Sequence, residues 1–425
     1  MIENNKRQSR TVSCYVFAFM AILVFSLPAV VSATTLEIWD WWSPTVMGQA
    51  ISTWWDHVEE RFEKENPGVN VEIMFVTGMP TKLITAVAAG VGPDVTQISV
   101  SYARDLYESG MLMPLNDFVS KTPSLSQDQF FPFARLFNSK DGVIYAVPHN
   151  VDNNSLHYDI DAFHEAGLDA DPLAIASWDM FRDYVRKLTR FSDTGQVVRA
   201  GYDTTIGTVS FQNWLYANGG DFYNKTHDGF LFAGPHGVEA LEFLLELRSH
   251  GQQAPAGTGL VFASRRAAIV LESGYGTRIV AENPDMNFGM TSLPPGPRGS
   301  ARAVTGWVNM LAIPTGAKNP ELAWEWIKYF AGLEGQLKFF EVYGRAGIPR
   351  LDFFRTRAWS NFVREHPFIR MLPHLLESAR EYPFVKYRDI NSILTTNVFN
   401  AIGRGVAPQA GLEEAQRLGN LLFAE

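Results

Sequence analysis

The chain has 425 residues, a formal net charge of −9 and a single cysteine. The length allows two or three domains, and 46% hydrophobic with 19% charged residues is typical of globular proteins, which excludes a disordered chain and a coiled coil. The acidic balance disfavours nucleic acid as a partner, and one cysteine excludes an internal disulfide and a thiolate zinc site.

The N-terminus has the three-part pattern of a secretory signal. Three basic residues lie within the first ten positions, an apolar run follows over Tyr15–Val31, and Ser32 and Ala33 end it with small side chains. The alternative is an uncleaved anchor, because the run approaches the shortest length that spans a bilayer. We expect cleavage after Ala33, which makes residues 1–33 a leader and the mature protein periplasmic.

The first part of the mature chain alternates predicted strands and helices. Strands are predicted at Leu36–Trp39, Val69–Phe75 and Val95–Val100, and apolar residues at helical spacing predict helices over Ile51–Phe62 and Lys82–Ala89. This β-α-β-α-β order implies a parallel sheet with helices on both faces.

A second α/β unit is expected after residue 148. Ser177 fits the N-cap of one helix, and Pro235 fits the first turn of another. Ala267–Leu271 is predicted to be a buried strand, and Glu321–Phe330 an aromatic-rich helix. The sequence therefore predicts two α/β lobes.

Three polar or aromatic stretches follow predicted strands. Ligands of open α/β sheets bind beyond the carboxyl ends of the strands, so these stretches are the first candidates for a site. The candidates after the first and third strands and after the strand of the second lobe are Asp40, Trp41, Trp42, Ser43, Ser99, Ser101, Tyr102, Glu272, Ser273 and Tyr275.

The Asp40–Ser43 stretch suits a sugar. An indole can cover the apolar face of a pyranose, while a carboxylate accepts hydrogen bonds from its hydroxyl groups. The alternative is that both tryptophans belong to the core. Because adjacent residues of an extended chain point to opposite sides, we expect one of Trp41 and Trp42 to be buried and the other exposed.

Seven segments in this order resemble one known family. They are TLEIWDWWSP, RFEKENPGVNVEI, AVAAGVGPDVTQI, DGVIYAVPHNVDNNSLHYDIDAFHEAGL, ANGGDF, FASRRAAIVLESGY and TGWVNMLAIPTGAKNPELAWEWIKYF. From about residue 35 to the C-terminus, the chain resembles the solute-binding proteins of bacterial sugar ABC importers, the large family that includes maltose-binding protein.

The resemblance implies a two-lobed, type II periplasmic binding protein-like fold with three hinge crossings. The crossings are expected near Pro148–Asn154, Val304–Gly306 and Ile348–Leu351. Both lobes are then discontinuous, with residues 34–148 and 306–350 in the N-lobe and residues 149–305 and 351–425 in the C-lobe.

The resemblance also implies further ligand-binding residues. An acidic residue near the first crossing faces the sugar in this family, although Asp152 can equally cap backbone N–H groups of the hinge. Tyr275 is placed as a stacking residue, and Trp307 stands where a glycine is more usual. The remaining candidates, which rest on position, are Asn153, Arg345, Trp359 and Tyr387.

The function implied is a non-enzymatic receptor. It would hold a mono- or oligosaccharide between its lobes and deliver it to the permease subunits of an ABC importer, as a monomer without cofactor or metal. One alternative is a secreted glycoside hydrolase, for which Asp40, Asp152 and Glu272 are the available carboxyl groups. The other is a receptor for a polyol phosphate such as glycerol 3-phosphate. Such a site needs clustered arginines, and only Arg104 lies next to the three stretches.

Overall fold

The computed structural model describes residues 34–424 except 204, 251–252, 259, 275, 344–346 and 383–384. The predicted leader, Tyr275 and Arg345 therefore lie outside the described residues, and the expectations for them stay predictions. Within the described part of the chain, none of the helices combines the length and the apolarity needed to cross a bilayer.

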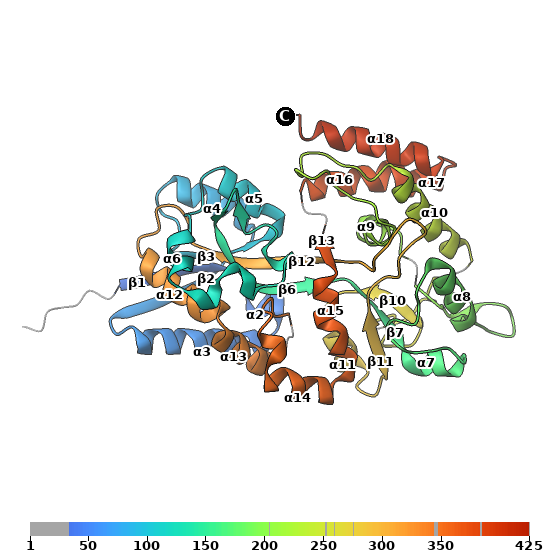
Figure 1. Ribbon diagram of the computed structural model, residues 1–425, viewed down its shortest axis with the longest axis horizontal. Coiled ribbons are helices and arrows are strands. Elements are labelled where there is room, and N and C mark those ends of the chain that lie inside the picture. The colour runs from blue at the N-terminus through green and yellow to red at the C-terminus, as the bar shows by residue number, and fades with distance from the viewer. Residues whose placement is uncertain are drawn as a thin grey trace, which may run out of the picture.

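The molecule has two lobes, each built on its own β-sheet (Figure 1). The sheet of the first lobe has six strands, and its path runs β13-β12-β3-β1-β2. Along one edge β12 pairs with β6, and along its other edge it pairs with β13 at its start and with β3 at its end. The predicted parallel arrangement holds for β1, which pairs in parallel with β2 and β3, whereas β12 runs antiparallel to β3 and β6. The six strands are β1 (Thr34–Asp40), β2 (Val69–Phe75), β3 (Val95–Ser99), β6 (Ala146–Asn153), β12 (Val304–Ala312) and β13 (Ala379–Glu381).

Helices and short turns surround this first sheet. The amphipathic helix α3 buries Ile51, Trp54, Val58 and Phe62 on its inner face, which confirms the helical spacing read from the sequence. The helices, turns and short strands of the first lobe are α2 (Pro44–Met47), α3 (Ala50–Glu65), α4 (Met79–Ala88), α5 (Val100–Glu108), α6 (Asn116–Ser120), η1 (Pro123–Leu125), η2 (Gln127–Gln129), η3 (Phe133–Arg135), β4 (Ser139–Lys140), β5 (Val143–Ile144), α12 (Pro320–Ala331) and α13 (Leu333–Tyr343).

The sheet of the second lobe is small and antiparallel. The strand β7 (Ser155–Asp159) lies between β10 (Ile269–Glu272) and β11 (Phe288–Thr291) and runs antiparallel to both. The expectation of a second unit like the first is therefore wrong for this sheet, because apolar runs mark strands without fixing the direction of their neighbours. A separate two-stranded ladder is formed by β8 (Arg190–Phe191) and β9 (Val197–Arg199).

The helices of the second lobe begin where the sequence places their caps. Ser177 Oγ accepts a hydrogen bond from the Met180 N–H at the start of α8, and Pro235 opens α10. Trp178 is buried and stacks on Phe243 with ring centroids 4.3 Å apart, so it is a core residue. These helices are α7 (Ile160–Glu165), α8 (Trp178–Leu188), α9 (Thr208–Ala217), α10 (Pro235–Ser249), α11 (Thr277–Glu282), α16 (Tyr387–Leu394), the π-helical turn η6 (Thr395–Phe399), α17 (Asn400–Ile402) and α18 (Pro408–Leu421).

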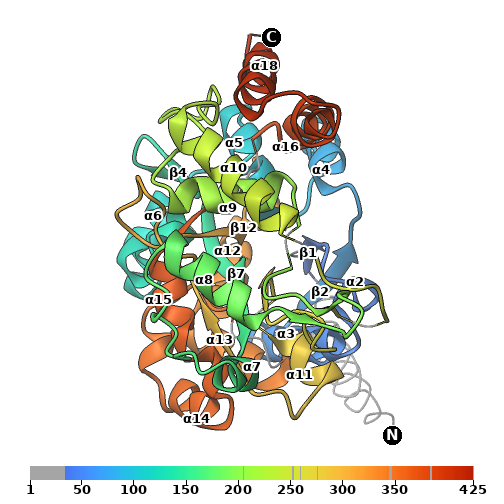
Figure 2. The same ribbon diagram turned by 90° about the vertical axis from the view of Figure 1, so that its right-hand side faces the viewer.

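The chain passes between the lobes along the central strands (Figure 1), and the view from the end of the second lobe places β7 and β12 near the middle of the molecule (Figure 2). Only Asn154 separates β6 of the first sheet from β7 of the second. β12 follows β11 after a loop, and a third segment lies against β6 through a bond from the Val151 N–H to the Gly347 carbonyl (2.9 Å). After that segment come η4 (Phe353–Arg355), α14 (Arg357–Glu365), η5 (Pro367–Met371) and α15 (Leu372–Glu377).

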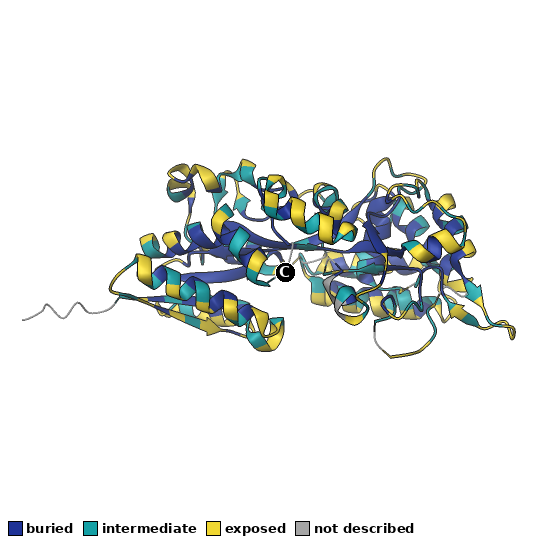
Figure 3. Cartoon of the chain, turned by 90° about the horizontal axis from the view of Figure 1, so that it is seen from below, coloured by how far each residue is buried: buried dark blue, intermediate teal, exposed yellow. Residues whose placement is uncertain are grey.

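Buried residues follow the strands of both lobes, and exposed residues lie on the outer helix surfaces (Figure 3). Aromatic side chains make up much of these cores. Trp54, Trp214 and Trp326 are among the largest side chains that are fully buried. Each lobe therefore has a packed interior of its own, joined by the central strands.

Candidate ligand-binding site between the lobes

The loop that follows β1 is held rigidly at the edge of the first sheet. Asp40 Oδ1 accepts a hydrogen bond from the Trp42 N–H (2.7 Å), and the Asp40 carbonyl accepts one from Val76 at the end of β2 (2.7 Å). Trp55 Nε1 donates to the Trp42 carbonyl (2.8 Å), and Ser43 caps α2. These bonds hold the backbone of the loop against the end of β2 and against α3.

The two tryptophans of this loop lie in different surroundings. Trp42 is 1% exposed, stacks on Phe339 (5.7 Å between centroids) and meets the edge of His149, whose pKa is lowered by burial to about 3. Trp41 is partly exposed and touches Trp42 only edge-on (6.1 Å, 83°). This agrees with the expectation that one ring of the pair is buried: Trp42 is a core residue and is removed from the ligand candidates, and Trp41 remains as the aromatic surface.

Asp40 is also buried rather than open to a ligand. Its side chain has no exposed surface, and burial raises its pKa to about 7, against the opposing effect of the Trp42 and Trp41 N–H groups. Its Oδ2 atom has no hydrogen-bond partner among the described residues. The expected role of Asp40 as an acceptor for ligand hydroxyls is therefore corrected to that of a group that positions the loop.

The candidates after β3 lie on the first turn of α5. Ser99 is the N-cap and accepts a weak hydrogen bond from the Ser101 N–H (3.4 Å). Ser101 is exposed and Tyr102 is partly buried. Burial raises the pKa of Tyr102, and the charge of Asp40 adds to the rise. Because β1 and β3 pair in parallel, the loop after β1 and the start of α5 follow neighbouring strands at the same edge of the sheet. Loop and helix start thus form one polar and aromatic edge.

The hinge candidates tie the lobes together. Asp152 Oδ1 accepts hydrogen bonds from Asn153 N–H (2.8 Å) and from Gly274 N–H (3.1 Å), which lies in the loop after β10. This is the backbone-capping role that the sequence left open. Trp307 is the register partner of Asp152 across β6 and β12, is partly exposed, and meets the Tyr382 ring edge-on (5.4 Å). Asn153 is buried.

The second lobe offers a polar cavity beside the hinge. The cavity has a volume of about 360 Å³ and is bordered by Glu272 and by Asn154. Sequence reasoning missed the rest of its lining, most of which comes from the segment that leads into α9. Its remaining polar residues are Tyr202, Asp203, Thr205, Thr208, Ser210 and Asn391.

These polar groups are held in place by one another. Thr208 Oγ1 donates to Asn391 Oδ1 (2.8 Å), Asn154 Nδ2 donates to Thr305 Oγ1 (2.9 Å), and Asp203 Oδ1 accepts from the Ala254 N–H (2.9 Å). Hydroxyl, amide and carboxyl groups fixed in this way suit a ligand with many hydroxyl groups. A run of glycine and hydroxyl-bearing residues precedes α9 in the sequence, and this run is the signal that could have revealed the surface.

Three further residues lie outside this surface. Trp359 was placed near the ligand by position alone, but it is 6% exposed and packs against the edge of Phe354 (4.8 Å), so that expectation is wrong. Tyr387 lies at the start of α16, 5.6 Å from the Tyr382 ring. The Asp94 carboxylate accepts hydrogen bonds from the Glu37 and Asn319 N–H groups, which gives it a structural role. No cluster of His, Cys, Asp or Glu suited to a metal ion occurs in the described residues.

Known proteins resemble this chain over most of its length. A protein of Brucella abortus (strain 2308), named only as a binding protein, is 23% identical over 85% of this chain and 88% of its own. The sn-glycerol-3-phosphate-binding periplasmic protein UgpB of Escherichia coli (strain K12) is 24% identical over 56% of this chain and 57% of its own.

Solved structures share the fold. The sugar-binding protein MalE of Xanthomonas citri superposes with a TM-score of 0.77 at 21% identity, covering 92% of this chain and 98% of MalE. An ABC transporter solute-binding protein of Thermotoga lettingae bound to α-D-tagatose gives a TM-score of 0.70 at 23% identity, covering 92% and 100%. Residues 46–337 match the bacterial extracellular solute-binding protein family. Since this match spans well over half of the sequence, the chain belongs to that family.

Proposed function

We propose that this protein captures a mono- or oligosaccharide between its lobes and delivers it to the permease subunits of an ABC importer. The observation that carries the proposal is the pairing of two surfaces. The first lobe presents the partly exposed Trp41 after β1, with Ser101 and Tyr102 after the neighbouring strand β3, and the second presents a cavity lined by hydroxyl, amide and carboxyl groups. An aromatic face and a polar wall match the two surfaces of a sugar ring.

A glycoside hydrolase is a weaker candidate for this geometry. Hydrolysis needs two carboxyl groups that reach the scissile bond, about 5–9.5 Å apart. Asp40 is buried, and one oxygen of Asp152 is occupied by two backbone N–H groups. Of the three carboxyl groups considered, this leaves Glu272 as the one that borders the cavity. We therefore propose binding without turnover.

A polyol phosphate is also a weaker ligand class. The cavity is bordered by two acidic side chains, Asp203 and Glu272, which would repel a phosphate. Arg104 is already engaged with Glu108 and with backbone carbonyls of another loop. Because UgpB is named as an sn-glycerol-3-phosphate-binding protein, glycerol 3-phosphate belongs among the compounds tested.

A thermal-shift screen tests the proposal directly. A ligand that binds only the folded state at 100 times its Kd adds about 2.7 kcal/mol to the free energy of unfolding. We expect at least one neutral mono- or oligosaccharide to raise Tm by several degrees, and glycerol 3-phosphate to leave it unchanged. Oligosaccharides that bind should be recovered intact after incubation. A shift with glycerol 3-phosphate alone, or cleavage of the sugar, would contradict the proposal.

A further inference from the structure

The cavity of the second lobe is acidic as well as polar. Asp203 and Glu272 both border it, and its described border residues include no lysine, arginine or histidine. The two carboxyl groups come from neighbouring segments, because the Asp203 N–H donates to the Ile269 carbonyl (3.0 Å) at the start of β10, the strand that ends at Glu272. Two carboxylates on one wall disfavour each other's charged form, and a cation bound beside them has the opposite effect.

The Asp203 carboxylate has an oxygen that is available to a ligand. Its Oδ1 accepts the Ala254 N–H (2.9 Å), whereas its Oδ2 makes no hydrogen bond or ion pair with the described residues. Arg266 lies beside the segment that leads to Asp203, but its guanidinium donates to the carbonyls of Pro255 (2.8 Å) and Thr258 (3.2 Å). In the described part of the chain, Asp203 therefore borders the cavity without a basic partner.

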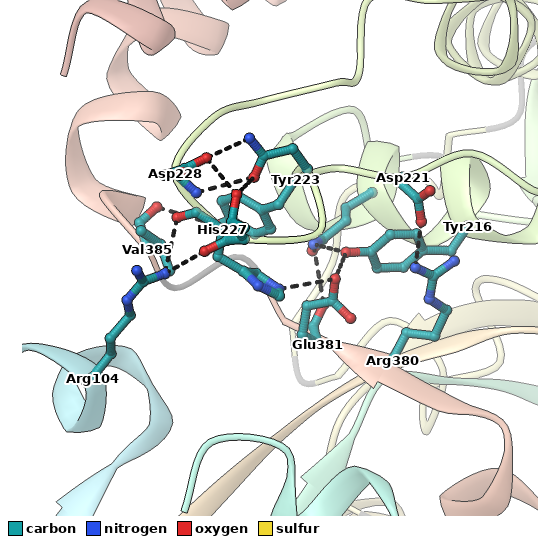
Figure 4. A network of polar contacts seen from close by, with 12 residues as sticks. Arg104, Tyr216, Asp221, Tyr223, His227, Asp228, Arg380, Glu381 and Val385 are labelled. Atoms are coloured by element: carbon teal, nitrogen blue, oxygen red, sulfur yellow. Dashed lines mark hydrogen bonds and ion pairs between the residues drawn. The ribbon is translucent and has the colours of Figure 1, made fainter. Parts of the chain in front are cut away.

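Figure 4 shows the contrasting arrangement, in which carboxylates are paired with basic side chains of the chain itself. Asp221 Oδ1 lies 2.6 Å from Arg380 Nη2, and Glu381 Oε1 lies 3.8 Å from His227 Nε2. None of these four side chains borders the cavity. Because Asp203 has no such pairing with the described residues, its charge is available to a ligand in the cavity.

A third acceptor at the cavity belongs to Asn154. This residue is 8% exposed, and its Nδ2 donates to Thr305 Oγ1 (2.9 Å). Its Oδ1 has no hydrogen-bond partner among the described residues, although most buried polar atoms have one. Asn154 directly precedes Ser155, the register partner of Glu272, so it lies beside the end of β10. Three acceptor groups, two of them carboxyl groups, thus border one cavity.

We propose that the ligand of this cavity is an amino sugar, whose ammonium group is bound by Asp203, Glu272 and Asn154. The proposal rests on the proposed function, because it specifies the class of saccharide that is captured between the lobes. An ammonium group has three N–H donors and no acceptor, which matches a wall with three acceptor groups. The partly exposed Trp41 of the first lobe suits the same ligand, since an indole attracts a cation as well as the apolar face of a sugar ring.

Matched ligands separate the charge of the sugar from its shape. D-Glucosamine, D-galactosamine and chitosan disaccharide are each titrated by calorimetry beside the N-acetyl form and the parent sugar, which lack the charge. A pH of about 6 keeps the amine protonated, because it lies well below the pKa of such amines. The variant Asp203→Asn keeps an acceptor for the Ala254 N–H and removes the charge. The control Asp193→Asn removes one charge from the exposed turn between β8 and β9.

We expect the wild type to bind at least one amino sugar about tenfold more tightly than its two neutral counterparts, because charge-assisted hydrogen bonds are the stronger ones. Asp203→Asn should reduce this preference to about twofold or less, and Asp193→Asn should keep it. Added salt should weaken the binding of the amino sugar more than that of the neutral sugars.

Two results would overturn the assignment of an amino sugar and leave the proposed function standing. One is that the neutral sugars bind as tightly as the amino sugars or more tightly. The other is that the preference for the charged sugar persists in Asp203→Asn. If no saccharide of any kind binds to the folded protein, the result contradicts the proposed function and the amino-sugar assignment together.

Discussion

Replacing Asp40 with asparagine is expected to remove a pH dependence of stability worth up to about 4 kcal/mol between pH 4 and pH 8. Burial raises the pKa of Asp40 from 3.8 to about 7. Between these values the folded protein holds a proton that the unfolded chain has released. The free energy of unfolding should therefore fall as the pH rises through this interval, with the loss complete above about pH 7.

Denaturant unfolding at several pH values measures this effect. The buried His149 and His157, whose pKa values burial lowers to about 3 and about 4, act with the opposite sign below pH 6.5. They are present in both proteins and cancel in the difference. Asp40→Ala is the matched control, since it also loses the titration but cannot accept the Trp42 N–H bond. It should be less stable than Asp40→Asn at every pH, and parallel curves for wild type and Asp40→Asn would contradict the assignment.

Alanine substitution of the adjacent tryptophans should separate binding from stability. Trp42→Ala is expected to cost about 3–5 kcal/mol of folding free energy, because it empties a site packed between Phe339 and His149. Trp41→Ala removes a partly exposed ring, so we expect a stability change below about 1 kcal/mol. Its effect should appear in binding, as a loss of about tenfold or more in sugar affinity.

Calorimetric titration and denaturant unfolding of both variants give the two quantities. Trp41→Phe keeps an aromatic face and should recover part of the affinity lost in Trp41→Ala. If Trp41→Ala binds the sugar as tightly as the wild type, Trp41 is not part of the site. A stable Trp42→Ala protein would contradict the core position of that ring.

Local patterns in the sequence predicted several helices of both lobes well. The spacing of Ile51, Trp54, Val58 and Phe62 marked α3, and Ser177 and Pro235 marked helix starts, because these signals act within one turn of the chain. The direction of β7 was not predictable in this way. It depends on pairing with strands more than 100 residues away in sequence.

The candidate site was predictable only in part, for the same reason. Alternation along an extended chain predicted that one tryptophan of the pair is buried, but neighbours from α13 and β6 decide that it is Trp42. Asp40 carries the same sequence signal whether its carboxyl group meets a ligand or a backbone N–H. The cavity beside Asn154 joins residues from four separate segments, and no local pattern connects them.

Small-angle scattering with and without a sugar identified by the screen tests capture between the lobes most directly. The sugar would touch Trp41 on one lobe and the polar cavity on the other, so it gains its full contacts only when the lobes meet. We expect the radius of gyration to decrease at saturation and tryptophan fluorescence to change with the same midpoint. An unchanged radius of gyration and unchanged fluorescence at a saturating sugar concentration would contradict closure around the ligand.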